Sequence, residues 1–251
     1  MTAPQTARFA SFDGVEIAYR TLGAGRPVLL LHGFLANAEL NWFAPGLAPA
    51  IAAAGHKVIA PDLRGHGASA APENEIAYPL DVLAIDQEAL LKHLDLADYD
   101  LVGYSLGART AVRLLARGAR PRKAVLGGMG DHGVTDVHRR IAYFNDAIEN
   151  GENAADPRAG KRVRAMMAQT GLKPAPMLNV LRAQRATTDE DLRAITTRAL
   201  VVSGHDDEDN GSAEGLASLL GNAKALRVPG NHLSAVGAPE LRDAIIDFLE
   251  R

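Results

Sequence analysis

A serine stands between two glycines in the stretch Gly103-Tyr104-Ser105-Leu106-Gly107, after an apolar run and before a helical pattern. A serine on a sharp strand-to-helix turn has a strained backbone, and side chains two residues to either side would collide with it, so glycine is needed at both places. Such a turn lifts the hydroxyl above a sheet and directs the N–H groups that open the helix toward developing negative charge. Chance would give roughly 0.06 matches to this spacing in a chain of this composition. The pattern predicts that Ser105 is a nucleophile.

A serine hydroxyl is a poor nucleophile near neutral pH and needs an adjacent base. Among the histidines, His232 follows the last apolar run and precedes the final helical pattern. This order places it at the carboxyl edge of a sheet, on the same side as Ser105. His93, in the polar part of a helix, and His56, just before a strand, are interpreted as surface residues. The other histidines are at positions 32, 66, 132, 138 and 205.

The elements that would hold these residues alternate between strands and helices. Asp13-Gly14 favours a tight hairpin turn between strands at 9–12 and 15–22. Continuous apolar runs predict strands that are buried on both faces, as in parallel sheets covered by helices. These runs occupy residues 27–31, 57–60, 99–103, 124–126 and 199–202, with a weaker one at 225–228. Apolar residues at three- and four-residue spacing predict helices over 80–96, 106–116 and 241–249. The order favours a mostly parallel sheet with an antiparallel edge.

One stretch, from about Asp131 to Ile195, contains helical patterns and no buried-strand run. It carries more apolar residues than a free-standing loop would, so part of it should face the sheet. We therefore predict a helical cap over the edge that holds Ser105, with Phe144 and Met167 lining a mainly apolar substrate pocket. The predicted domains are a core of residues 1–130 and 196–251 and a cap of residues 131–195. The apolar residues that suggest this cap are Ile141, Phe144, Met166, Met167, Met177 and Leu178.

Four motifs follow one another along the chain: His32-Gly33-Phe34, the stretch from Pro61 to Gly67, the stretch from Gly103 to Gly107, and Gly230-Asn231-His232. In this order, with strands between them, the chain resembles the α/β-hydrolase fold family over nearly its whole length. The resemblance implies an α/β-hydrolase fold with a mostly parallel central sheet, helices on both faces and a small helical cap. It also implies that Ser105 is the nucleophile, that His232 is the general base and then acid, and that the N–H groups of Phe34 and Leu106 form the oxyanion hole.

The same resemblance assigns His32, His66 and Asp62 to shaping their loops. For the catalytic acid, the family pattern Gly-x-x-Asp in Ser203-Gly204-His205-Asp206-Asp207 selects Asp207. Asp206 is adjacent, and Asp131 stands where some members of the family place the acid. Both remain alternatives, because a triad is recognised by its geometry and not by its position in the sequence.

The composition of the chain excludes several classes of binding partner and cofactor. The net charge of −3 gives no electrostatic reason to expect binding to nucleic acid or to a membrane surface. The absence of cysteine excludes thiolate nucleophiles and cysteine-bound metals, and it fits a reducing compartment. No nucleotide-binding or metal-binding motif is present, so no metal and no organic cofactor is predicted. Without a signal peptide or an apolar run long enough to span a membrane, the expected location is the cytoplasm.

The predicted function is a serine hydrolase that cleaves a small-molecule carboxylic ester or lactone by acyl transfer. Ser105 argues against the dehalogenases and epoxide hydrolases of the family, which use a carboxylate nucleophile. Two alternatives stay open: a serine carbon–carbon bond hydrolase of the same fold, and a small-molecule receptor that keeps the triad with little turnover. The sequence does not determine the substrate or the oligomeric state.

Overall fold

The central feature of the computed structural model, which describes residues 3–251, is an eight-stranded sheet in the order β1-β2-β4-β3-β5-β6-β7-β8. The six strands from β4 to β8 in this order run parallel to one another, and β2 pairs antiparallel with both β1 and β4. The predicted mostly parallel sheet with an antiparallel edge is confirmed. In chain order the strands are β1 (Gln5–Ala10), β2 (Glu16–Gly23), β3 (Arg26–Leu31), β4 (His56–Pro61), β5 (Asp100–Tyr104), β6 (Lys123–Gly127), β7 (Arg198–Gly204) and β8 (Ala223–Val228).

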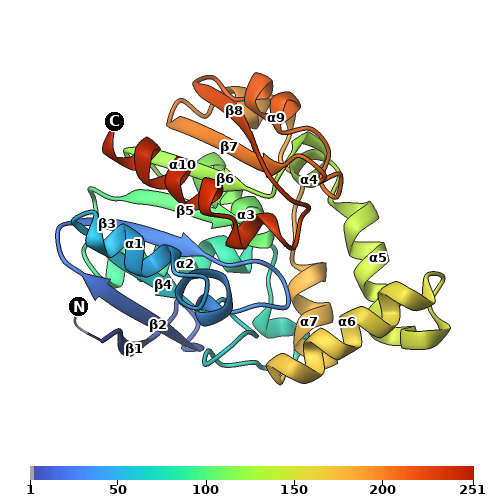
Figure 1. Cartoon of the computed structure of the whole chain (residues 1–251). Coiled ribbons are helices and arrows are strands. Elements are labelled where there is room, and N and C mark those ends of the chain that lie inside the picture. The colour runs from blue at the N-terminus through green and yellow to red at the C-terminus, as the bar shows by residue number, and fades with distance from the viewer. Residues whose placement is uncertain (1–2) are drawn as a thin grey trace.

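Helices cover both faces of this sheet, which is why its strands are continuous apolar runs. In β3, Val28 and Leu30 point to one face and Leu29 and Leu31 to the other, and all four are fully buried. On the first face, α1 (Leu47–Ala53) packs against α10 (Pro239–Glu250), and both lie in front of the sheet in Figure 1. The second face is covered by α2 (Val82–His93), α3 (Leu106–Ala116) and α9 (Ala213–Leu219).

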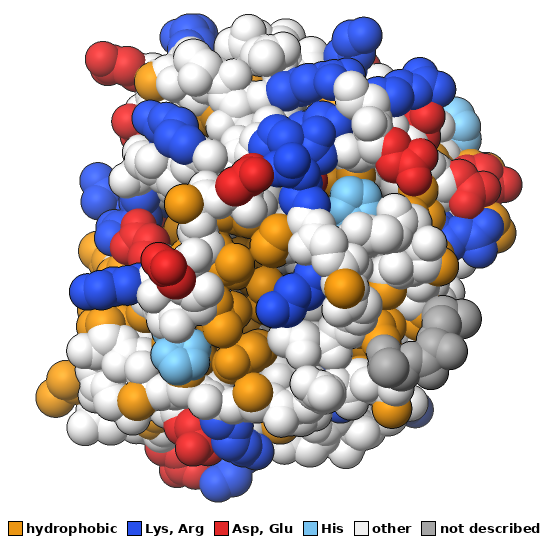
Figure 2. Space-filling view, turned by 90° about the vertical axis from the view of Figure 1, so that its left-hand side faces the viewer, with side chains coloured by type: hydrophobic (Ala, Val, Ile, Leu, Met, Phe, Trp, Pro, Cys, Tyr) orange, Lys and Arg blue, Asp and Glu red, His pale blue; other side chains and the backbone are white. Residues whose placement is uncertain are grey.

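The helix α10 is fixed at its C-terminal end by two cations from the start of β6. Lys123 donates to the carbonyl groups of Phe248 and Leu249, each at 2.9 Å. Arg122 donates to the carbonyl of Leu249 at 2.7 Å and forms an ion pair with the buried Asp100. Cations at a helix C-terminus offset the partial negative charge of its unpaired carbonyl groups. Figure 2 shows the face at the left of Figure 1, where basic and acidic side chains are interspersed around a group of hydrophobic ones.

The stretch between β6 and β7 contains helices and no strand, as predicted. Its elements are α4 (Asp131–Thr135), α5 (Val137–Asn150), α6 (Pro157–Thr170), α7 (Pro174–Arg182) and α8 (Asp189–Arg193). We call α5, α6 and α7 the cap helices; α5 packs against the other two, and all three lie at the right of Figure 1. The division of the chain into a core and a cap domain stays a prediction.

A buried ionic network ties the loop after β4 to the start of the chain. The Arg64 guanidinium is fully buried and donates to Asp86 at 2.6 and 2.9 Å and to Asp13 at 2.6 and 2.9 Å. Ser11 donates to the same Asp86 carboxylate at 2.6 Å. Burial raises the pKa of Asp86, and the hydrogen bonds and charge of Arg64 oppose this shift. Within residues 3–251, no helix combines the length and the apolar composition that crossing a membrane requires.

Candidate active site

Ser105 lies on the turn between β5 and α3, at the carboxyl edge of the sheet. Its backbone has φ 53° and ψ −114°, a strained conformation for a residue with a side chain. A Cβ on Gly103 would lie 2.3 Å from the carbonyl oxygen of Gly107, and a Cβ on Gly107 would lie 1.9 Å from the carbonyl oxygen of Leu31. The two glycines are therefore required by close packing of the turn, as the sequence pattern predicts.

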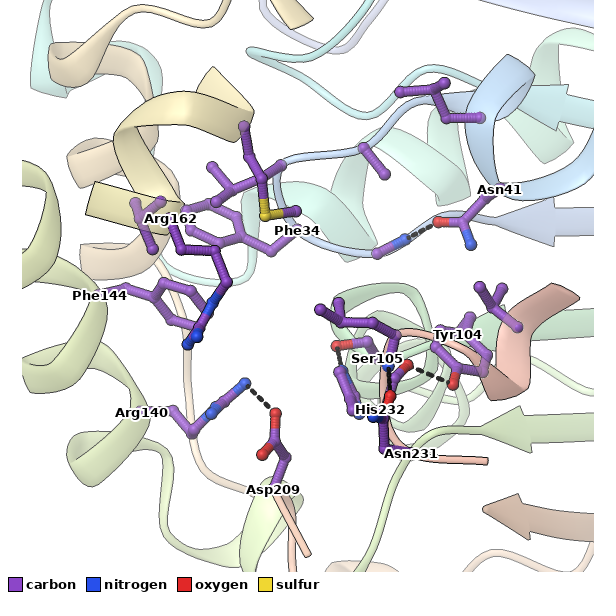
Figure 3. Close-up of a pocket in the computed structure, with 18 of the residues that line it drawn as sticks. Phe34, Asn41, Tyr104, Ser105, Arg140, Phe144, Arg162, Asp209, Asn231 and His232 are labelled. Carbon is purple, nitrogen blue, oxygen red and sulfur yellow. Dashed lines mark hydrogen bonds and ion pairs between the residues drawn. The ribbon is translucent and has the colours of Figure 1, made fainter. Parts of the chain in front are cut away.

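Three side chains from distant parts of the chain form one line of hydrogen bonds. His232 Nε2 lies 2.9 Å from Ser105 Oγ, and His232 Nδ1 lies 2.9 Å from Asp207 Oδ2. With Asp207 ionised, the proton stays on Nδ1, and the lone pair of Nε2 accepts the hydrogen bond from the serine hydroxyl. Figure 3 shows Ser105 and His232 side by side at the wall of the cavity.

Asp207 is well placed to remain an anion. Its side chain is buried, which by itself raises its pKa, but the hydrogen bond and charge of His232 outweigh burial and hold the pKa of Asp207 below its usual value. The backbone N–H of Asp209 also donates to its other carboxylate oxygen at 3.2 Å. An ionised Asp207 keeps the imidazole of His232 in the tautomer that can accept a proton from Ser105.

The two other acids that the sequence left open take different positions. Asp131 accepts hydrogen bonds from the backbone N–H groups of His132 at 2.8 Å and Ser212 at 2.9 Å, so it organises the start of α4. Asp206 lies on the wall of the cavity, exposed, and its carboxylate does not bond to His232. Of the three candidates, the structure brings Asp207 to the histidine.

A tyrosine and an asparagine that the sequence analysis did not single out support this arrangement. The hydroxyl of Tyr104 donates to the backbone carbonyl of His232 at 2.8 Å and so fixes the histidine loop to the end of β5. Asn41, in a π-helical turn over Glu39–Phe43, accepts a hydrogen bond from the N–H of Gly33 at 2.8 Å. This contact orients the chain that leads into Phe34 (Figure 3). The sequence offers no sufficient signal for Asn41, because a polar residue eight positions after a His-Gly motif is common in any sequence.

The N–H groups of Phe34 and Leu106 make no hydrogen bond within residues 3–251. Phe34 lies on the cavity wall beside Gly33, and a Cβ on Gly33 would be 3.5 Å from the Cβ of Ser105. Leu106 is the first residue of α3, so its N–H is one of the unpaired donors at a helix start. Both donors are available to an oxygen atom bound beside Ser105.

The histidines of the two other motifs hold loops. His32 is fully buried; its Nδ1 donates to the carbonyl of Gly33 at 2.8 Å, and its Nε2 accepts from the N–H of Leu63 at 2.9 Å. Burial lowers the pKa of His32 to about 4 and that of His66 to about 3, so both rings are neutral at physiological pH. Asp62 accepts from the N–H groups of Ala38 and Ala68, each at 2.8 Å, and thereby joins the two loops.

A cavity of about 810 Å³ opens above Ser105 and His232. Phe144 of α5 lines it, as predicted, with its ring edge-on to Phe34 at 4.9 Å between centroids. The prediction for Met167 is wrong: this residue is 4% exposed and packs into the hydrophobic core, and its neighbour Met166 lines the cavity instead. The side of α6 that faces the core could not be read from the sequence, where the two methionines are equivalent.

Residues 26–143 match the family described as the alpha/beta hydrolase fold. Over 95% of its length the chain is 29% identical to a non-heme haloperoxidase from Rhodococcus erythropolis, of which the match covers 97%. Its structure is similar to that of a hydrolase from Pseudomonas aeruginosa PA01, at a TM-score of 0.77 and 26% identity over 100% of both chains. It is also similar to the esterase RhEst1 from Rhodococcus sp. ECU1013, at a TM-score of 0.74 and 25% identity over 98% of both chains.

Proposed function

Because the chain belongs to the α/β-hydrolase fold family, we propose that it is a serine hydrolase that cleaves a small-molecule carboxylic ester or lactone. The observation that carries the proposal is the line of hydrogen bonds from Ser105 through His232 to Asp207. A nucleophile, a base and an acid that orients the base are the parts that acyl transfer requires. The likeness to an esterase of known structure supports an ester as the substrate.

In the proposed reaction, Ser105 Oγ attacks the carbonyl carbon of the ester while His232 Nε2 takes the hydroxyl proton. The negative charge that develops on the carbonyl oxygen is stabilised by the N–H groups of Phe34 and Leu106 and by the start of α3. His232 then gives its proton to the leaving alcohol, and an acyl group remains on Ser105. Water, deprotonated by His232, releases the acyl group as a carboxylic acid and restores the hydroxyl.

The cavity suits a small substrate. Its volume falls within the roughly 300–1,000 Å³ of ordinary ligand pockets. The aromatic rings of Phe34 and Phe144, together with Val163 and Met166, give it an apolar wall for an acyl or alcohol group. Met166 adapts to irregular shapes, so we expect several chain lengths to be accepted.

Covalent labelling tests the nucleophile. A fluorophosphonate probe should label the wild-type protein once, and Ser105→Ala should abolish both the labelling and the hydrolysis of an activated ester. A circular dichroism spectrum like that of the wild type would show that the variant is folded. Labelling that persists in Ser105→Ala would refute the assignment.

The acid is tested by two neutral substitutions on the same loop. Asp207→Asn should lower kcat by about 10⁴-fold, because the imidazole of His232 loses the partner that fixes its tautomer. Asp206→Asn is the matched control, since Asp206 is adjacent and its carboxylate makes no hydrogen bond to His232; its effect should stay within about threefold. Equal losses in the two variants would contradict the role proposed for Asp207.

A further inference from the structure

The cavity above Ser105 has a cationic wall where the cap helices border it. Arg139 and Arg140 of α5 and Arg162 of α6 all line it. In Figure 3, Arg140 and Arg162 extend from the cap helices on either side of Phe144, across the cavity from Ser105 and His232. Phe34 and Phe144 give this side of the cavity an apolar surface as well.

The guanidinium N–H groups of this cationic wall are only partly occupied by hydrogen bonds within the protein. Arg140 pairs with Asp209 at 3.2 Å and lies over the ring of Phe144 at 4.8 Å. Arg162 donates one hydrogen bond at 2.8 Å to the hydroxyl of Tyr143, a neutral group. A guanidinium has five N–H donors, and within residues 3–251 no carboxylate lies within ion-pair distance of Arg162 or Arg139. Donors therefore remain for a carboxylate that enters the cavity.

A buried cation behind the wall adds to its positive charge. Arg109 of α3 is 6% exposed and donates to the carbonyl of Gly133 at 2.7 Å, with no carboxylate partner within residues 3–251. Burial, with a smaller contribution from the nearby charge of Arg140, lowers the pKa of Arg109 to about 10, so it remains a cation at neutral pH. A fixed charge in a poorly solvated place acts over a longer range than an exposed one.

We propose that the substrate is an ester or lactone that carries a carboxylate remote from the bond to be cleaved, and that Arg162 binds this carboxylate. This inference rests on the proposed function. The reacting carbonyl lies at Ser105, a short apolar chain crosses Phe34 and Phe144, and the carboxylate meets Arg162. Arg139 and Arg140 add positive charge around it. Monoesters of dicarboxylic acids have this pattern of groups.

Acidic residues of the cavity wall favour a substrate of the opposite charge. Asp206, Glu208 and Asp209, on the loop after β7, also line the cavity. Asp209 is paired with Arg140. Asp206 and Glu208 are exposed to solvent, as are Arg139 and Arg162, so solvent screens charges of both signs, and the acids lack a buried charge on their side such as that of Arg109. If these acids dominated, the cavity would select a substrate with a remote ammonium group.

Three methyl esters of matched length separate these cases: methyl hexanoate, monomethyl adipate and methyl 6-aminohexanoate, which are neutral, anionic and cationic near neutral pH. We expect kcat/KM to be highest for monomethyl adipate and lowest for the amino ester. In Arg162→Gln the ratio of kcat/KM for the adipate ester to that for methyl hexanoate should fall about tenfold, the lower range for a hydrogen bond to a charged group. Arg162→Lys should retain part of the ratio, because the charge remains without the planar fork of donors.

The matched control is Lys161→Gln, which removes one positive charge from the adjacent, exposed position on α6, outside the cavity wall. It should leave the ratio within about twofold of the wild type, since an exposed charge outside the cavity is screened. An unchanged ratio in Arg162→Gln, or a preference for the amino ester in the wild type, would overturn the inference.

Binding to Ser105→Ala, measured by calorimetry, keeps this test independent of turnover. The variant should bind monomethyl adipate about tenfold more tightly than methyl hexanoate, and the double variant Ser105→Ala/Arg162→Gln should lose that preference. Equal affinities would refute the carboxylate site even in an active esterase. Tight, Arg162-dependent binding by a protein that cleaves none of the esters would instead refute the proposed hydrolysis and leave the carboxylate site standing.

Discussion

Gly107 offers a sharp test of how the turn at Ser105 is built, because a single methyl group has no room there. A Cβ at this position would lie 1.9 Å from the carbonyl oxygen of Leu31, 2.4 Å from its carbonyl carbon and 2.8 Å from the carbonyl oxygen of His32. All of these contacts are with backbone of a central strand and its loop, which no side-chain rotation can relieve. In Gly107→Ala, α3 must move away from β3 by more than about 1 Å to restore ordinary contacts.

Two effects follow from that displacement. Overpacking a buried site costs about 1–3 kcal/mol of the free energy of unfolding, and each kcal/mol lowers Tm by about 2–4 °C in a domain of this size. The helix also carries the N–H of Leu106 and the backbone of Ser105, so both move relative to His232. A misplacement of about 1 Å at a reacting group can lower the rate about 100-fold.

The assay is thermal unfolding together with kcat/KM for an activated ester and the rate of fluorophosphonate labelling. Gly237→Ala is the matched control, since a Cβ at Gly237 would meet no atom within 4 Å and its φ is not in the left-handed region. We expect Gly107→Ala to lose several degrees of Tm and about 100-fold in kcat/KM, with labelling slowed to a similar extent. A Gly107→Ala protein with the Tm and the activity of Gly237→Ala would refute this account of the turn.

Two further predictions concern His66 and the two adjacent methionines of α6. Because the folded-state pKa of His66 (about 3) is below its unfolded value, its contribution to stability is present above about pH 6.5 and is lost as the pH falls. The loss in the free energy of unfolding should amount to about 2 kcal/mol between about pH 7 and pH 5. Denaturant unfolding of His66→Gln should show a correspondingly weaker pH dependence than the wild type, and an unchanged pH dependence would contradict this role of His66. For the cap, Met166→Ala should shift the preference among esters of increasing acyl length with little change in Tm, while Met167→Ala should lower the free energy of unfolding by about 2–5 kcal/mol and leave the preference unchanged. The reverse pattern would place the wrong methionine at the cavity.

The buried parallel strands could be predicted because each carries its own signal, whereas β1, expected at 9–12, lies at Gln5–Ala10. In β3 successive side chains enter cores on opposite faces of the sheet, so the run Val28-Leu29-Leu30-Leu31 has no polar position. The helix α3 begins and ends where its apolar spacing predicts, at Leu106 and Ala116. The hairpin at Asp13-Gly14 is present with a wider turn, since β1 ends at Ala10 and β2 begins at Glu16.

The cationic wall of the cavity could not be predicted from the sequence. Arginines at helical spacing in a sequence ordinarily indicate the solvated face of an amphipathic helix. Arg140 and Arg162 belong to different helices, and only the packing of α5 against α6 brings them to one cavity. The same is true of Asn41, whose partner Gly33 lies in another loop.

What the sequence by itself determined is the local chemistry: the glycine-flanked turn that exposes Ser105 and the strand that positions it, since both depend on residues close together in the chain. Only the tertiary structure decided which side chains meet. Ser105 and His232 are 127 residues apart, and Asp206, Asp207 and Asp131 are equivalent carboxylates until the loop after β7 turns one of them toward the imidazole. Met166 and Met167 differ by one step, about 100° around a helix, so the packing of α6 alone determines which lines the cavity. Contacts between distant segments depend on how whole helices and strands pack, and the spacing of neighbouring residues in the sequence does not specify that packing.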